Sequence, residues 1–172
     1  MTTKLLLVIK NPNEDLELAK NYIEGKNHDD FFIKNLKQIK KHLQSYTIVN
    51  DELYNNNNKV NYPIKLYLKD QFGMIKESKI VKMLEKHQHA YEIRIEREIG
   101  RVSSYTHRIT YCLDSELNSY ILTFGFTKSY QDTSNKFKDV TDLCGEETDK
   151  IKIQLLNKEY SKWLGEEDYY EL

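Results

Sequence analysis

The sequence has few of the residues that cross-link or interrupt small folds. Two cysteines, two prolines and six glycines occur in 172 residues, and Cys112 and Cys144 lie far apart. This composition excludes a disulfide framework and argues against a linker-rich or disordered chain. The apolar run at residues 5–9 is too short for a signal peptide or a membrane span. We therefore expect one folded domain, in the cytoplasm and without a membrane partner.

Charge is balanced overall but unevenly distributed. The chain carries 26 basic and 27 acidic residues, which is not the basic balance of an autonomous nucleic-acid-binding protein. Residues 61–130 hold 11 basic against 8 acidic residues, whereas residues 131–172 hold 6 against 11. A basic centre with an acidic tail is consistent with a masked site for an anionic ligand, and ordinary surface scatter is the alternative.

Apolar spacing predicts helices in the first half of the chain. A buried strand is expected at residues 4–10, followed by helices at 13–25 and from about Asp30 to Leu43. Pro63 suits a helix start and Gly73 a helix stop, so a helix is expected between them. A further helix is expected over residues 78–89.

Three alternating segments, 91–97, 105–113 and 120–128, predict an antiparallel meander with one apolar and one solvated face. Helical spacing returns afterwards, with one piece ending at Cys144-Gly145 and a terminal helix over 151–164. The expected class is α+β. An antiparallel sheet of three to four strands packs on helices by one face, after an N-terminal strand–helix–helix extension and before a C-terminal helix. The expected divisions are 1–45, 46–144 and 145–172.

Arg94 and Arg108 fall on the polar face of this predicted sheet, on adjacent strands and beside Thr110. Neighbours across two strands lie about 5 Å apart, so two guanidinium groups there can grip one phosphodiester. The alternative is that both arginines neutralise Glu92 and Glu96 in surface ion pairs, each contributing less than about 1 kcal/mol.

Other constellations point to no metal and no cofactor. His87 and His89 have the spacing of two metal ligands, but no third ligand stands at a suggestive distance. His107 can serve as a general acid or base, and Cys112 has no visible partner that would activate it. Phosphate-binding, dinucleotide-binding and hydrolase motifs do not occur.

Three stretches carry a resemblance to a known family: "TIVNDELYNNNNKVNYPIKLYLKDQF", "AYEIRIERE" and "HRITYCLDSELNSYILTFGFTKSYQDTS". Over residues 46–144 the chain resembles the RelE/ParE toxin superfamily, especially its HigB-like, phage-derived branch. The first stretch is similar to that family's opening strand and helix, and the other two to its later strands.

The resemblance implies a toxin of a toxin–antitoxin pair, a metal-independent endoribonuclease that cleaves mRNA, free or on the ribosome. It implies a cognate antitoxin that covers the basic sheet. Cleavage would use the 2′-OH of the RNA, with cations that stabilise the phosphorane. Carried onto this sequence, the catalytic residues would be Arg94, Arg108, Lys128, Tyr111 and Tyr130. The RNA-binding residues would be Arg97, Arg101, His107 and Thr110.

Departures from the family favour a second hypothesis. The chain is longer and less basic than such toxins, and Ser129 stands where the family has a second lysine. By strand parity, Lys128 and Tyr111 face away from Arg94 unless the strand bulges. The alternative function is a non-catalytic phage or mobile-element protein that binds and inhibits a host nuclease or defence complex. The acidic tail and the 13 tyrosines favour it.

Overall fold

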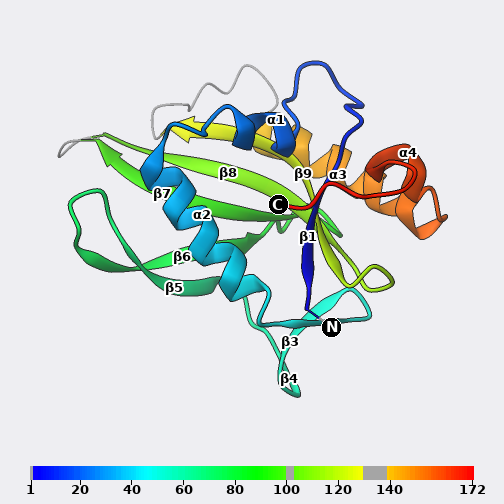
Figure 1. Cartoon of the computed structure of the whole chain (residues 1–172), viewed down its shortest axis with the longest axis horizontal. Coiled ribbons are helices and arrows are strands. Elements are labelled where there is room, and N and C mark those ends of the chain that lie inside the picture. The colour runs from blue at the N-terminus through cyan, green and yellow to red at the C-terminus, as the bar shows by residue number, and fades with distance from the viewer. Residues whose placement is uncertain (1, 100–102, 130–138) are drawn as a thin grey trace.

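The computed structural model describes residues 2–99, 103–129 and 139–172, which form two sheets and four helices (Figure 1). The main sheet has the order β1-β9-β8-β7-β6-β5. Its strands are β1 (Lys4–Leu7), β5 (Ile64–Lys69), β6 (Ile75–Met83), β7 (Tyr91–Ile99), β8 (Ser103–Asp114) and β9 (Ser119–Ser129). The small sheet contains β2 (Thr47–Val49), β3 (Glu52–Asn55) and β4 (Asn58–Lys59). The helices are α1 (Ala19–Glu24), α2 (Asp30–Leu43), α3 (Val140–Leu156) and α4 (Tyr160–Leu164).

The chain is α+β, but the expected antiparallel sheet of three to four strands is wrong. The main sheet is mixed, has six strands and curls strongly into a half-barrel. β1 pairs with β9 in parallel, from Lys4 opposite Ser119 to Leu7 opposite Leu122. The N-terminal strand therefore completes the main sheet instead of belonging to a separate extension.

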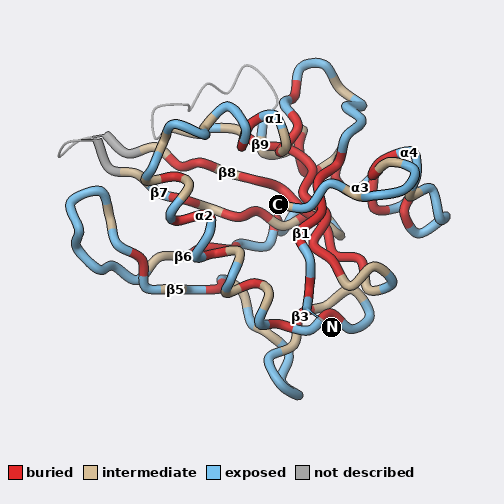
Figure 2. Tube along the Cα trace, in the orientation of Figure 1, coloured by how far each residue is buried: buried red, intermediate tan, exposed pale blue. Residues whose placement is uncertain are grey.

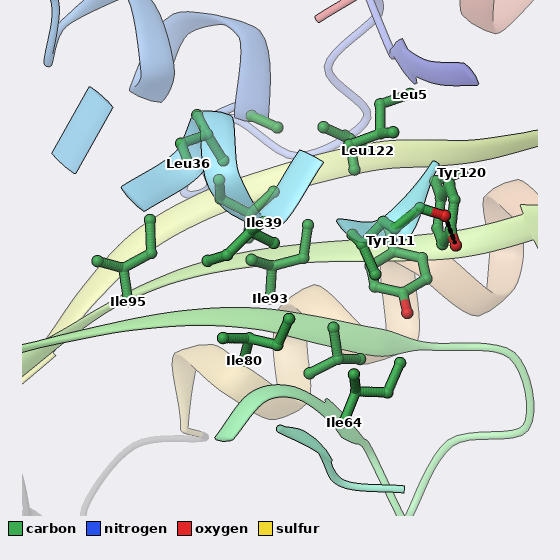
Figure 3. Packing of buried hydrophobic residues seen from close by; sticks show 14 of the residues in the cluster. Leu5, Leu36, Ile39, Ile64, Ile80, Ile93, Ile95, Tyr111, Tyr120 and Leu122 are labelled. Carbon is green, nitrogen blue, oxygen red and sulfur yellow. Dashed lines mark hydrogen bonds between the residues drawn. The ribbon is translucent and has the colours of Figure 1, made fainter. Parts of the chain in front are cut away.

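One face of the sheet, here the α2 face, is covered by α1 and α2. The Asp29 side chain accepts a hydrogen bond from the Phe32 amide and caps α2, as helices prefer. α2 then buries one apolar side, and Figure 3 shows Leu36 and Ile39 from this helix facing the strand residues of the core. The helix predicted from Asp30 to Leu43 is confirmed.

The opposite face, here the α3 face, is covered by α3 and α4, so the expected solvated face is wrong. Cys144, Ile151 and Leu155 of α3 pack with Cys112 and Ile121 of the sheet. The central strands β8 and β9 are accordingly buried over most of their length (Figure 2). No helix of the described residues is long and apolar enough to cross a membrane.

α3 runs through Gly145, where the sequence predicted a helix end. A Cβ atom at Gly145 would lie 2.4 Å from the His87 ring. Glycine is therefore present because the helix approaches this side chain closely, not because the chain must turn there.

The helices predicted at 63–73 and 78–89 are wrong, because both segments form strands. β5 and β6 make an antiparallel hairpin that runs from Ile64 opposite Val81 to Lys69 opposite Ile75. At its tip, the Asp70 carboxylate accepts hydrogen bonds from the amides of Phe72 and Met74. Gly73 supplies the positive φ of 84° that the turn requires.

Candidate functional site

The two arginines singled out from the sequence are direct cross-strand neighbours. Arg94 of β7 pairs with Arg108 of β8, and both point to the α3 face. Lys128 shares this face, since Phe126 pairs with Arg108 and Lys128 with Thr106. The pairing of β8 with β9 shifts register between Ile109 and Tyr111. This β-bulge places Lys128 on the same face as Arg94, as the sequence pattern required for the two to meet.

The carboxylate of Glu92 lies between the two arginines and is only 1% exposed. Arg108 Nη1 donates to both carboxylate oxygens at 3.1 and 3.4 Å, and Arg94 Nε lies 3.7 Å from Oε1. The alternative interpretation paired these arginines with Glu92 and Glu96 at the surface. Only its pairing with Glu92 is confirmed, and that carboxylate is buried rather than superficial. An isolated buried carboxylate costs several kcal/mol, so each arginine stabilises the fold by neutralising it.

Burial also acts on the arginine itself. Removal from water lowers the pKa of Arg108, while the attraction of Glu92 opposes that shift and the repulsion of Arg94 adds to it. The positive charges of Arg94 and Arg108 are therefore offset by one shared carboxylate, that of Glu92. A phosphate group that enters this cluster has to compete with Glu92 for the same guanidinium nitrogens.

Lys128 is likewise paired. Its Nζ lies 2.7 Å from the Asp139 carboxylate, which also caps α3 by accepting a hydrogen bond from the Thr141 amide. Arg94, Arg108 and Lys128 thus each lie close to a carboxylate, Glu92 or Asp139.

Arg97 belongs to the opposite, α2 face. Its guanidinium makes two hydrogen bonds to the Asp29 carboxylate, at 2.9 and 2.5 Å, and a third to the Tyr105 hydroxyl at 2.9 Å. It also lies over the Phe31 ring, 4.6 Å from the centroid. This geometry ties β7 to the start of α2 and makes Arg97 part of the packing between them.

The remaining predicted residues are buried or lie outside the described ranges. His107 is 2% exposed, with its Nδ1 2.6 Å from the Tyr22 hydroxyl, and Tyr111 is fully buried with its ring stacked on Tyr91. Thr110, also fully buried, shares one hydroxyl–hydroxyl hydrogen bond of 2.7 Å with Thr123, which joins β8 to β9. Arg101 and Tyr130 lie outside the described residues.

A cleft that the sequence did not reveal lies beside Arg94, between β6 and β7. Its volume is about 380 Å³, and its walls come from α2, from the β5–β6 hairpin and from β7. The signal that marks it in the sequence is the adjacent pair Ile80 and Val81, both fully buried, which breaks the period-two pattern of β6. Arg94 therefore belongs both to the cluster around Glu92 and to the rim of this cleft.

The histidine and cysteine candidates have structural surroundings. His87 lies 3.4 Å from Asp142 and 3.7 Å from Asp149 and contacts α3. Burial raises the pKa of both the Cys112 and Cys144 thiols to about 12, which keeps them protonated and unreactive at neutral pH.

No family model, no curated protein and no solved structure matches this chain. The resemblance to the RelE/ParE superfamily therefore stays a prediction. The helix that it implies after the first strand is wrong, because residues 64–69 form β5.

The ion pairs of Glu92 with Arg94 and Arg108 predict a contribution to the stability of the fold. Glu92→Gln removes the shared charge and leaves two guanidinium groups without it, so we expect a loss of roughly 2–4 kcal/mol in the free energy of unfolding. Urea denaturation measures this loss. Glu96→Gln, on the same strand and exposed, is the matched control and should change the free energy by less than about 0.5 kcal/mol. Equal effects of the two variants would contradict the structural role of Glu92.

His107 predicts a pH dependence of stability. Burial, with help from Arg97 and Lys26, lowers its pKa from 6.5 to about 4 in the folded chain. The unfolded chain then binds the proton more tightly, so stability is full above pH 6.5 and falls as the pH drops towards 4. The loss from this residue is at most about 3 kcal/mol.

Thermal unfolding between pH 4 and 7 measures this dependence. We expect His107→Asn to flatten the profile over that window, whereas His28→Asn, at an exposed position, leaves it unchanged. A wild-type profile that is already flat would contradict the burial argument.

Proposed function

We propose that this protein acts by binding another protein, without catalysis, and that the β5–β6 hairpin is the main contact. The observation that carries this proposal is the hairpin's exposed apolar surface. Tyr67, Phe72, Met74 and Ile75 are each at least 66% exposed, on a hairpin that projects away from β7 (Figures 1 and 2). Apolar patches of this kind, with charged residues around them, are typical of protein contact sites.

The hairpin presents this surface in an ordered form. Tyr67 pairs with Glu77 and Lys69 with Ile75, so these side chains share the face directed away from buried Leu68. The hydrogen bonds that the Asp70 carboxylate accepts from the Phe72 and Met74 amides hold the tip in place. An ordered contact surface loses less conformational entropy on binding than a flexible one, which favours affinity.

RNA cleavage is the second candidate, and one observation favours it. Arg94, Arg108 and Lys128 lie on one face near the N-terminus of α3. The pairing of these cations with Glu92 and Asp139 weighs against it, because an RNA phosphate would have to displace carboxylates already in contact. The inhibited host nuclease expected from the sequence stays a prediction about the identity of the partner.

Site-specific photo-crosslinking in bacteria, together with an RNA cleavage assay, distinguishes the two candidates. A photoreactive amino acid at Phe72 should crosslink to protein, whereas the same group at Asn56, exposed on the other hairpin, should not. Purified protein should leave mRNA intact, with or without ribosomes. Cleavage that Lys128→Ala abolishes would contradict the proposal, since this partly exposed lysine can be replaced without unpairing Glu92.

A further inference from the structure

β6 and β7 separate part-way along their length. They pair from Met83 opposite Tyr91 to Val81 opposite Ile93, and the pairing then stops. Residues 75–79 of β6 and 94–99 of β7 are still strands, but they pair with β5 and β8 respectively and not with each other. In the described residues, no other backbone hydrogen bond reaches 94–97. Along residues 94–97 of β7, alternate N–H and C=O groups therefore point into the cleft without a backbone partner among the described residues.

A β-bulge explains the separation. Ile64 pairs with Val81 and Lys65 with Lys79, so Ile80 is an extra residue in β6. Ile80 and Val81 are both fully buried, which bends the strand at the point where its pairing with β7 ends. The cleft is thus built into the fold and is present before any partner binds.

The walls of the cleft differ on its two sides. Phe31 of α2, Leu68 of β5 and Ile95 of β7 belong to the apolar core on the α2 face. On the other side lie Lys79 and Arg94. Lys82 adjoins them. Over the whole lining, five cations stand against four carboxylates: Lys69, Lys76, Lys79, Lys82 and Arg94 against Asp70, Glu77, Glu85 and Glu96.

We propose that this cleft binds an extended segment of the partner protein, which adds as a strand along the open edge of β7. Side chains of a strand alternate between its two faces. The segment therefore places apolar residues against Phe31, Leu68 and Ile95 and acidic residues towards Lys79 and Lys82. This inference rests on the proposed protein-binding function and specifies the partner's contact as a strand of alternating apolar and acidic residues.

Amide hydrogen exchange of the full chain, followed by NMR, tests the open edge first. In the free protein we expect every second amide of residues 94–97 to exchange rapidly, because only alternate amides face β8. The peptide Val-Asp-Val-Glu-Val-Asp-Val, at millimolar concentration, should then slow those amides at least tenfold. Uniformly slow exchange over 94–97 in the free protein would overturn the proposal.

Fluorescence anisotropy with the labelled peptide tests the chemistry of the segment. Methylation of alternate peptide nitrogens, or regrouping of the same residues as four valines followed by three acids, should weaken binding at least tenfold. Lys79→Glu should weaken it about tenfold, whereas Lys41→Glu, an exposed lysine of α2, should leave it unchanged. Equal binding of the methylated peptide, or no effect of Lys79→Glu, would overturn the proposal.

The outcome for the cleft is separable from that for the proposed function. If the peptide does not bind but Phe72 still crosslinks to protein, the proposed role of the cleft is wrong and the proposed protein-binding function is retained. RNA cleavage dependent on Lys128 removes the proposed function whatever the peptide does. Concentration-dependent dimers in sedimentation, with slowed exchange at 94–97, would assign the cleft to a second copy of this chain and overturn the proposed partner.

Discussion

The buried carboxylate of Glu92 determines which partner the arginines in the middle of the main sheet bind. It lies under α3, where an uncompensated charge is costly, and the guanidinium groups of Arg94 and Arg108 from neighbouring strands neutralise it. The same two arginines are the natural candidates for a phosphate site on this face. Because Glu92 already occupies them, they contribute first to the stability of the sheet. The surfaces of the sheet that remain open to a partner are therefore its edges rather than its covered faces.

The edges of the main sheet differ in how their backbone groups are covered. The β1 edge is covered by the C-terminal residues, with hydrogen bonds from the Leu7 amide to Tyr170 and from the Leu172 amide to Leu5. The outer strand β5 carries lysines, including Lys65, which discourage uncontrolled strand pairing. The edge of β7 over residues 94–97, which the bulge at Ile80 separates from β6, has no such backbone hydrogen bonds in the described residues. An open edge beside an exposed apolar hairpin is a combination that suits recognition of another chain.

The sequence predicted the elements whose pattern is local. Alternation over 91–128 gave β7, β8 and β9, and amphipathic spacing gave α2. β5 was missed because Ile64 and Leu68 are also spaced four apart, as in a helix, although Leu66 between them marks a strand. The buried α3 face was missed because the Thr110 and Thr123 hydroxyls look solvated until Thr148 of α3 is placed against them. Parallel pairing of β1 and the bulge in β6 depend on contacts between distant residues, which periodicity does not report.

A double-mutant cycle between Glu92 and Arg108, measured by chemical denaturation, tests the central claim most directly. The single variants Glu92→Gln and Arg108→Gln and their combination give the coupling energy between the two side chains. If the buried ion pair holds the sheet and α3 together, the coupling is about 2–3 kcal/mol. A coupling below about 0.5 kcal/mol would mean that Arg108 is not committed to Glu92 and is available to bind an anion, which would contradict the account.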